Sequence, residues 1–374
     1  MAGKLKHWRT ETISYAPDKA FTVIHRSTVS PSRELTYNAS SWAVLGATRF
    51  GLALIVFLSH MMWFSPHNAI LQHVSMLGGK AAVLGFFLIS GASIGHSYRD
   101  RPDGFYRRRF LRIYPLYFVA AIFSETLCLI YPGGIVCPAM AFPTAGIKTG
   151  IANLFLLQEF IAIPINYNLP LWTLSIEVFL YLLTPRFALW SEKIIIGLIV
   201  ISMVTFHFQY ILGSCLGGFP VMVFGWPWLI GFLLIRSTDR RIPLVLGIVG
   251  AFLVFVNKGI TVQPLSTVTY LSVLFLLVAV PYASLPGYVR TLADWLGDIS
   301  YPLYLFHAPL ALMAFAWLGF HRLFDFLVFI FLTVVALYYL VDVYWKKIFW
   351  KPLVNYSVAQ FAKRRPASFA AAKS

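Results

Sequence analysis

The first long apolar stretch of the chain holds two ionisable side chains. Arg49 and His60 stand eleven positions apart, which at about 100° per residue places them on one face of a helix, about 16 Å apart along its axis. An ionisable group within an apolar span is costly, so it is by default a candidate for function. Arg49 would lie in the inner half of the span and His60 near its outer end, where one face could contact both ends of a long ligand. The alternatives are a structural ion pair for Arg49 and, for His60, an interfacial histidine that bonds a neighbour.

A polar stripe marks a second apolar segment. Its members recur at helical spacing: Thr173, Glu177, Tyr181 and Thr184. We expect Glu177 to lie at a depth similar to that of His60, where a carboxylate would fix the tautomer of the imidazole and raise its basicity, as in general-base catalysis. A buried carboxylate that only bonds across helices is the alternative.

Two further sets of residues have the spacing of one helix face. Arg109 and Arg112 stand three apart at the start of another apolar segment, a geometry suited to phosphate, whose oxygens accept paired guanidinium hydrogen bonds. Charges that only set the orientation in the membrane are the alternative. Ser300, Tyr304 and His307 recur at i, i+4 and i+7. For this stripe, helix packing with hydrogen bonds is favoured over contact with a substrate.

The composition indicates the solvent that surrounds these groups. Hydrophobic residues make up 59% of the 374-residue chain and charged residues only 12%, with a mean hydropathy of +0.74. These values exclude an ordinary soluble enzyme, which carries about 25% charged residues, and a disordered polyelectrolyte. The net charge of +16 would suggest nucleic acid in a polar protein. In a chain this apolar it indicates lipid, a basic cytoplasmic side and an anionic ligand.

Cysteine spacing and the absence of short motifs exclude several other classes of protein. Cys128, Cys137 and Cys215 form neither a disulfide framework nor a metal site, and whether Cys137 and Cys215 pair is left open by the sequence. Walker, GxGxxG, HExxH and GxSxG signatures are absent. We expect no metal and no nucleic-acid partner.

The distribution of apolar residues predicts an all-α integral membrane protein. A bilayer core needs about 20 mostly apolar residues per helix. Ten segments meet this requirement: 42–64, 79–97, 111–131, 169–186, 193–212, 219–235, 242–257, 265–283, 299–318 and 324–344. The shorter apolar segment 151–163 contains Gln158 and Glu159, and parity of the crossings makes it a re-entrant or interfacial segment on the outer side.

The basic loops predict the orientation of the chain in the membrane. Arginines concentrate in the loops 97–109 and 236–241, and the positive-inside bias places both in the cytoplasm together with both termini. We therefore predict three parts: a polar basic cytoplasmic tail over 1–40, a membrane domain over 41–345 and a basic cytoplasmic tail over 346–374. Residues 1–40 show no signal peptide.

Five fragments, in this order and at this spacing, resemble the membrane acyltransferase-3 family over about residues 40–345. They are Arg49-x10-His60, Phe86 to Gly91, Arg107 to Tyr117 with its Arg-x-x-Arg, Leu171 to Glu177, and Ile299 to His307. The resemblance implies a ten-span enzyme of the inner (cytoplasmic) membrane. It also implies transfer of an acyl group, mostly acetyl, from cytoplasmic acyl-CoA to a hydroxyl of a cell-surface or lipid-linked glycan. Some members act instead on lipids or small molecules.

The resemblance also implies roles for single residues. It implies that His60 is the essential histidine, Arg49 its companion and Glu177 the acidic partner, with Arg109 and Arg112 as acyl-CoA contacts. Tyr304 and His307 match recurrent positions of the family, and under the other interpretation of their stripe they are candidate substrate contacts together with Trp172. Many members end in Glu-x-Pro after the last span, where this chain reads Tyr339 to Tyr344. With about 30 residues after Tyr344, a stand-alone transferase without an appended hydrolase-like domain is expected.

The residue pattern and the family resemblance together predict one mechanism, in which the role of His60 is left open. The phosphates of the donor would bind at Arg109 and Arg112 and its arm would pass Arg49, which brings the thioester to His60. His60 would act either as general base, oriented by Glu177, or as a nucleophile that is acylated first. The segment 132–168 would be a lid or acceptor surface. A transporter or flippase for an anionic glycolipid is the main alternative, although no inverted repeat is visible. A non-catalytic membrane scaffold is another.

Overall fold

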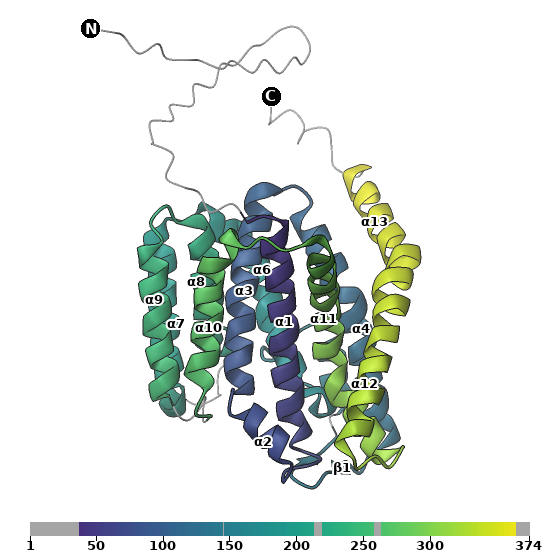
Figure 1. The fold of residues 1–374 in the computed structure, drawn as a ribbon. Helices are drawn as coiled ribbons and strands as arrows, with labels where there is room; N and C mark the ends of the chain where they lie inside the picture. Colours follow the sequence, from purple (N-terminus) through teal and green to yellow (C-terminus); the bar gives the residue numbers. More distant parts are fainter. Residues whose placement is uncertain (1–36, 145, 213–218, 258–262, 364–374) are drawn as a thin grey trace, which may run out of the picture. The chain divides into compact units, whose positions relative to one another are not determined.

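The structure is a computed structural model that describes residues 37–144, 146–212, 219–257 and 263–363. The predicted tail over 1–40 falls almost wholly outside the described residues, as does Cys215. Within the described part, helices run side by side as a bundle (Figure 1). The bundle consists of α1 (Ala39–Met61), α2 (Ala69–Ser75), α3 (Gly79–Asp100), α4 (Phe105–Ile130), α5 (Ile147–Leu154), α6 (Trp172–Leu189), α7 (Glu192–Leu212), α8 (Phe219–Arg236), α9 (Arg241–Val256), α10 (Ser266–Ala279), α11 (Gly287–Ala316), α12 (Leu323–Leu337) and α13 (Lys351–Lys363).

The prediction of an all-α membrane protein is confirmed. Six helices of the described residues are long and apolar enough to cross a membrane: α1, α3, α4, the part of α7 over Glu192–Gln209, α11 and the continuous stretch Leu323–Val358. Three more apolar helices are shorter, over Pro220–Arg236, Arg241–Val256 and Ser266–Tyr282. Each of the ten segments expected to span coincides with a helix, but ten crossings and cytoplasmic termini stay predictions.

Two helices are longer than the sequence suggested. α11 begins at Gly287, well before the expected start at 299. After α12 the chain continues without a break through a π-helix, η3 (Tyr338–Trp350), into α13, so the first part of the predicted tail over 346–374 is helical. Apolar periodicity marks the part of a helix that lipid or protein covers, whereas a helix can extend into water beyond that part.

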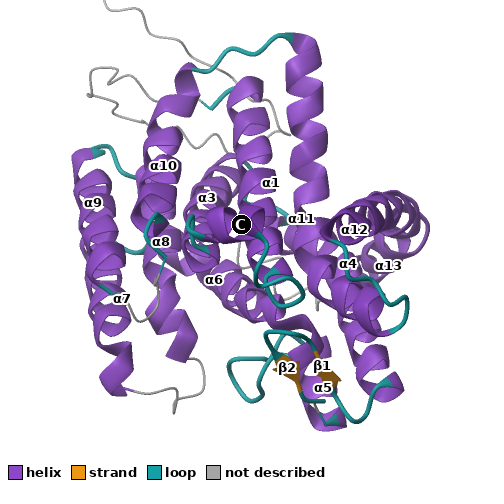
Figure 2. Ribbon diagram, turned by 60° about the horizontal axis from the view of Figure 1, so that its bottom comes forward, coloured by secondary structure: helices purple, strands orange, loops and turns teal. Residues whose placement is uncertain are grey.

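The segment between α4 and α6 is irregular. It holds a short antiparallel hairpin of β1 (Ile135–Val136) and β2 (Ala141–Phe142), then α5 and a 3-10 helix η1 (Asn166–Leu171). Figure 2 shows the hairpin beside α5. The apolar stretch 151–163 is no continuous helix, because α5 ends at Leu154 and positive φ angles follow at Leu156 and Glu159. That it lies on the outer side stays a prediction.

Glycines let backbones approach at the centre of the bundle. A Cβ on Gly231 of α8 would lie 2.0 Å from the Leu88 carbonyl oxygen of α3, and one on Gly91 would lie 1.8 Å from the Trp228 carbonyl oxygen. In the same way a Cβ on Gly297 of α11 would lie 2.7 Å from the Gly46 Cα of α1. Close backbone contact of this kind is how helices associate in lipid, where no hydrophobic effect drives them together.

One of the two prolines within α11 is compensated by a side chain from η1. Pro309 has no backbone N–H, so the Leu305 carbonyl lacks its usual helical donor. Asn168 Nδ2 donates to that carbonyl at 3.0 Å and to Ser124 Oγ of α4 at 3.0 Å. Asn168 is fully buried and holds a non-helical conformation at φ −146° and ψ 61°. This clamp ties the middle of α11 to α4 and to the segment before α6.

We predict that Gly231→Ala destabilises the bundle by about 1–3 kcal/mol, because the new methyl group meets backbone rather than a side chain that can move. The measurement is the thermal unfolding midpoint of the detergent-solubilised protein. Gly197→Ala in α7 is the matched control, since nothing lies within 4 Å of its Cβ and alanine favours the helix. Equal midpoints for the two variants would contradict the close contact of α3 with α8.

Candidate functional site

A cavity of about 350 Å³ lies between α1, α3, α4, α6 and α11. Four of the residues selected from the sequence line it together: Arg49, Arg109, Arg112 and Glu177. Three guanidinium groups and one carboxylate therefore share one space, although they come from three helices. This convergence supports reading Arg109 and Arg112 as ligand contacts as well as charges that orient the protein.

The arginines are arranged by depth. Arg112 is exposed, whereas Arg49 and Arg109 are half-buried. Arg109 donates through Nη2 to Ser97 Oγ at 2.5 Å. The Nε atoms of Arg49 and Arg109 are buried without a hydrogen-bond partner, and within the described ranges neither guanidinium forms an ion pair. Unsatisfied guanidinium groups that line a cavity form a site for an anion, because they offer planar donors at fixed angles.

Glu177 is bonded at one oxygen to two neighbours. Ser90 of α3 donates to Glu177 Oε1 at 2.5 Å, and Tyr181 donates to the same oxygen from one turn further along α6. The predicted polar stripe of α6 thus faces protein, as its position in an apolar helix requires. The sequence analysis included Ser90 only within the fragment Phe86 to Gly91, whereas the structure places it against Glu177.

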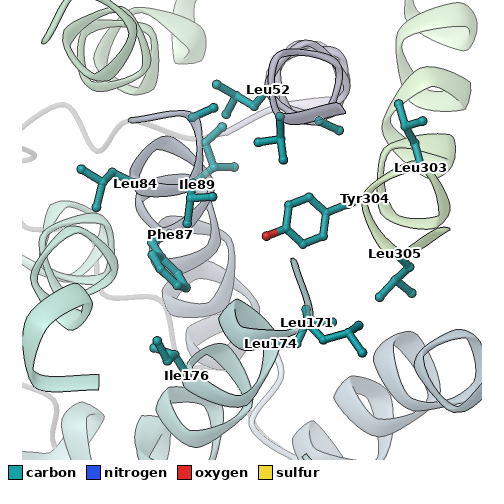
Figure 3. Packing of buried hydrophobic residues seen from close by; sticks show 14 of the residues in the cluster. Leu52, Leu84, Phe87, Ile89, Leu171, Leu174, Ile176, Leu303, Tyr304 and Leu305 are labelled. Atoms are coloured by element: carbon teal, nitrogen blue, oxygen red, sulfur yellow. The ribbon is translucent and has the colours of Figure 1, made fainter. Parts of the chain in front are cut away.

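Tyr304 connects the cavity to the second part of the site. Its hydroxyl lies 2.9 Å from Thr173 Oγ1, and both residues line the cavity. Figure 3 shows the ring extending from α11 toward α3 and α6 among buried apolar side chains. The Tyr304 ring centroid lies 6.1 Å from that of His307. The predicted Ser300–Tyr304–His307 stripe is buried, and two of its members, Ser300 and Tyr304, line the cavity.

His60 forms its hydrogen bond to a second histidine. His60 Nδ1 lies 2.8 Å from His307 Nε2, and His307 Nδ1 lies 3.0 Å from the Leu303 carbonyl oxygen. The expected pairing of His60 with Glu177 is therefore wrong. The physical reason is the packing, since α1 lies along α11, whereas Glu177 is on α6 and bonds to α3. A common depth in the membrane did not bring the two side chains together.

Aromatic rings enclose the histidine pair. The Trp63 ring stacks on His60, with centroids 4.2 Å apart and planes 25° apart. Phe142 of the hairpin meets the Trp63 ring edge-on, and the Ala139 N–H donates to the Trp63 carbonyl at 3.1 Å. The hairpin thus packs against the residue that covers His60. The sequence interpretation missed Trp63, which its place three residues after His60 could have revealed.

Trp172 lies away from this site. Its ring packs on Phe224 of α8 with centroids 4.9 Å apart, and it does not line the cavity. The neighbouring Thr173 does, because adjacent residues of a helix point in different directions. The geometry therefore gives no support to the predicted substrate contact of Trp172. Among the described residues no group of three or more His, Cys, Asp or Glu side chains is placed to hold a metal ion.

Comparison with known proteins identifies the family. A sequence model of the acyltransferase-3 family, described as an acyltransferase domain, matches residues 43–344. The chain belongs to this acyltransferase family. A relative named Acyltransferase MdmB, from Streptomyces mycarofaciens, is 32% identical over 155 residues, which is 38% of this chain and 38% of that relative. No solved structure matches the chain.

The acyltransferase thus has two chemically distinct regions joined at Tyr304. One is a cationic cavity with unsatisfied guanidinium groups. The other is a pair of hydrogen-bonded imidazoles under an aromatic cover. Acyl transfer to a hydroxyl needs a site for an activated donor and a group that takes the hydroxyl proton, and imidazole is the commonest such group. The two regions supply both kinds of group.

We predict that Arg49→Met stabilises the ligand-free protein by about 1 kcal/mol or more, because it removes a buried cation that has no ion-pair partner. The thermal unfolding midpoint without ligand should therefore rise. Lys346→Met is the contrasting variant, since Lys346 pairs with Asp342 at 2.7 Å and its loss leaves that carboxylate unpaired. A lowered midpoint for Arg49→Met would contradict the prediction, because it would show that the wild-type Arg49 guanidinium group is stabilised within the ligand-free fold.

Proposed function

We propose that this acyltransferase is a multi-pass O-acyltransferase of the inner membrane. It transfers an acyl group, specifically acetyl, from cytoplasmic acyl-CoA to a hydroxyl of a cell-surface or lipid-linked glycan. The single observation that carries the proposal is the cavity lined by Arg49, Arg109 and Arg112, which reaches Tyr304 beside the His60–His307 pair. A binding site for an anionic donor and a candidate base therefore lie within one helix bundle.

The donor side fits a molecule with phosphates at one end and a long arm. Arg109 and Arg112 lie in the first two turns of α4, and both line the cavity. Arg109 lines the cavity, and its guanidinium group donates hydrogen bonds of the kind that phosphate oxygens accept. At about 350 Å³ the cavity is at the small end of ligand pockets. It suits the arm and acyl group, with the nucleotide held at the mouth near Arg112.

The walls of the cavity suit an arm that alternates amides with methylene groups. Ser90, Thr173 and Ser300 offer hydroxyls, and Phe86 and Phe87 offer apolar surface. Tyr304 marks the end from which the thioester would approach His60. His60 takes the proton of the acceptor hydroxyl in this proposal, with its direct acylation as the other possible route.

The acceptor side is the hairpin and α5, which lie between α4 and α6 in the chain. The hairpin packs on Trp63, and Trp63 covers His60, so an acceptor that reaches the imidazole from this end meets these elements first. In the orientation that the basic loops predict, this end faces away from the cytoplasm. A surface glycan would arrive there, whereas a lipid or small-molecule acceptor would enter between helices.

We predict that His60→Ala lowers acyl transfer by about 10²–10⁴-fold, the usual cost of removing a general base. The assay supplies radiolabelled acetyl-CoA to inside-out vesicles and follows label into glycan or lipid. His207→Ala is the matched control, because His207 is an exposed histidine on α7. Undiminished transfer by a folded His60→Ala protein would overturn the mechanism, and translocation of a glycolipid without acylation would favour a transporter instead.

We predict that Arg109→Gln raises the KM for acyl-CoA by about 10-fold or more with little change in kcat, since a charge-assisted hydrogen bond contributes about 1.5–3 kcal/mol. The control is Arg107→Gln, because Arg107 is exposed and does not line the cavity. Steady-state kinetics in the same vesicles measure both variants. An equal rise in KM for the two would show a general effect of surface charge.

A further inference from the structure

The hydrogen bonds of the two histidines determine where their protons are. His307 Nδ1 faces the Leu303 carbonyl oxygen at 3.0 Å, and a carbonyl can only accept, so Nδ1 carries the proton. In a neutral imidazole the other nitrogen is then an acceptor. His307 Nε2 must therefore accept from His60 Nδ1, which lies 2.8 Å away. His60 Nδ1 carries its proton in turn, and His60 Nε2 is left with a free lone pair.

The geometry of the rings agrees with this direction of donation. The two ring planes are 10° apart, and their centroids are 5.1 Å apart while the bonded nitrogens are only 2.8 Å apart. The bonded nitrogens thus lie between the centroids, and the rings meet edge to edge in nearly one plane. A ring N–H points within its own plane, so this arrangement aligns the His60 donor with the His307 lone pair.

The two histidines differ in exposure. His307 is fully buried, at 0% exposure, whereas His60 is half-buried. α11 is clamped two residues before His307, where Asn168 holds the Leu305 carbonyl, and Phe57 of α1 packs on the His307 ring with centroids 5.9 Å apart. His307 is therefore held rigidly and out of reach of a substrate, while His60 remains the accessible member of the pair.

We propose that His307 is a positioning residue for acyl transfer. It holds His60 in the Nδ1–H tautomer, so that His60 Nε2 is the base. The inference rests on the proposed function. In the step, the acceptor oxygen bonds to the thioester carbonyl carbon, its proton moves to His60 Nε2, the carbon–sulfur bond breaks, and the proton passes from Nε2 to the leaving thiolate. His60 Nδ1–H stays bonded to His307 throughout.

A neutral orienting group suits this location. A carboxylate in the same place would be a charge taken out of water, whose cost in an apolar interior is several kcal/mol. His307 fixes the tautomer without adding a charge, and when His60 is transiently protonated the face of Trp63 stabilises the cation. Glu177 instead lines the cavity that Arg49, Arg109 and Arg112 also line.

Two substitutions separate positioning from packing. In His307→Gln the side-chain amide reaches the place of Nε2, and its oxygen can accept from His60 Nδ1, so we expect a kcat within about 10-fold of the wild type. His307→Leu offers no acceptor, so we expect kcat to fall by about 10²-fold or more with an unchanged KM for acyl-CoA. Phe57→Leu controls for packing against His307, and we expect a kcat within about 10-fold of wild type. Equal loss in His307→Gln and His307→Leu would overturn the proposal.

A spectroscopic measurement tests the tautomer without reference to activity. The full chain in lipid nanodiscs is labelled with ¹⁵N-histidine, and His60→Gln assigns the His60 signals among the nine histidines. We expect a protonated Nδ1 and a bare Nε2 at His60 in the wild type, and a shift toward the Nε2–H form in His307→Leu. A protonated Nε2 in the wild type would overturn the proposal even where loss of activity in His60→Ala upholds the proposed function.

Discussion

α1 and α11 approach closely where Gly46 faces Gly297, and the other parts of the site depend on this contact. A side chain at Gly297 would meet the backbone of Gly46 and separate the two helices that carry His60 and His307. The same pair of helices contributes Arg49 and Tyr304 to the cavity. The contact is possible because neither glycine carries a side chain. Lipid offers no hydrophobic force between helices, so their association depends on close packing and on polar groups that bond across the interface.

Charged and neutral polar groups lie in different parts of this bundle. The cavity collects three guanidinium groups and one carboxylate, whereas the imidazole pair is neutral and shielded by aromatic rings. Unpaired buried cations cost stability, and the fold retains two guanidinium groups with unsatisfied Nε atoms. A loss of stability of this kind is expected at a charged group that binds a ligand. The separation also keeps His60, the proposed base, away from the cationic guanidinium groups, which would disfavour its protonated form during the proposed transfer.

The irregular segment between α4 and α6 has a structural role as well as its proposed place near the acceptor. Asn168 completes the hydrogen bonding of α11 where Pro309 interrupts it, and Gln158 donates to the Leu171 carbonyl at 2.9 Å just before α6 begins. Both side chains are fully buried. The segment is therefore bonded to α11, which carries His307, and to the residue before α6, which carries Glu177.

The sequence by itself determined the elements and the charged residues of the cavity. Apolar stretches are local, so the ten helices could be located, and Arg49, Arg109, Arg112 and Glu177 were conspicuous because lipid does not solvate charge. The partners of these residues were decided only by tertiary structure. Glu177 bonds to Ser90 rather than His60, Trp172 packs on Phe224, and His307, assigned from sequence to a substrate, bonds to His60. Spacing along one helix fixes which side chains share a face, but the helix that lies opposite that face depends on backbone contacts between segments distant in sequence, such as Gly46 with Gly297.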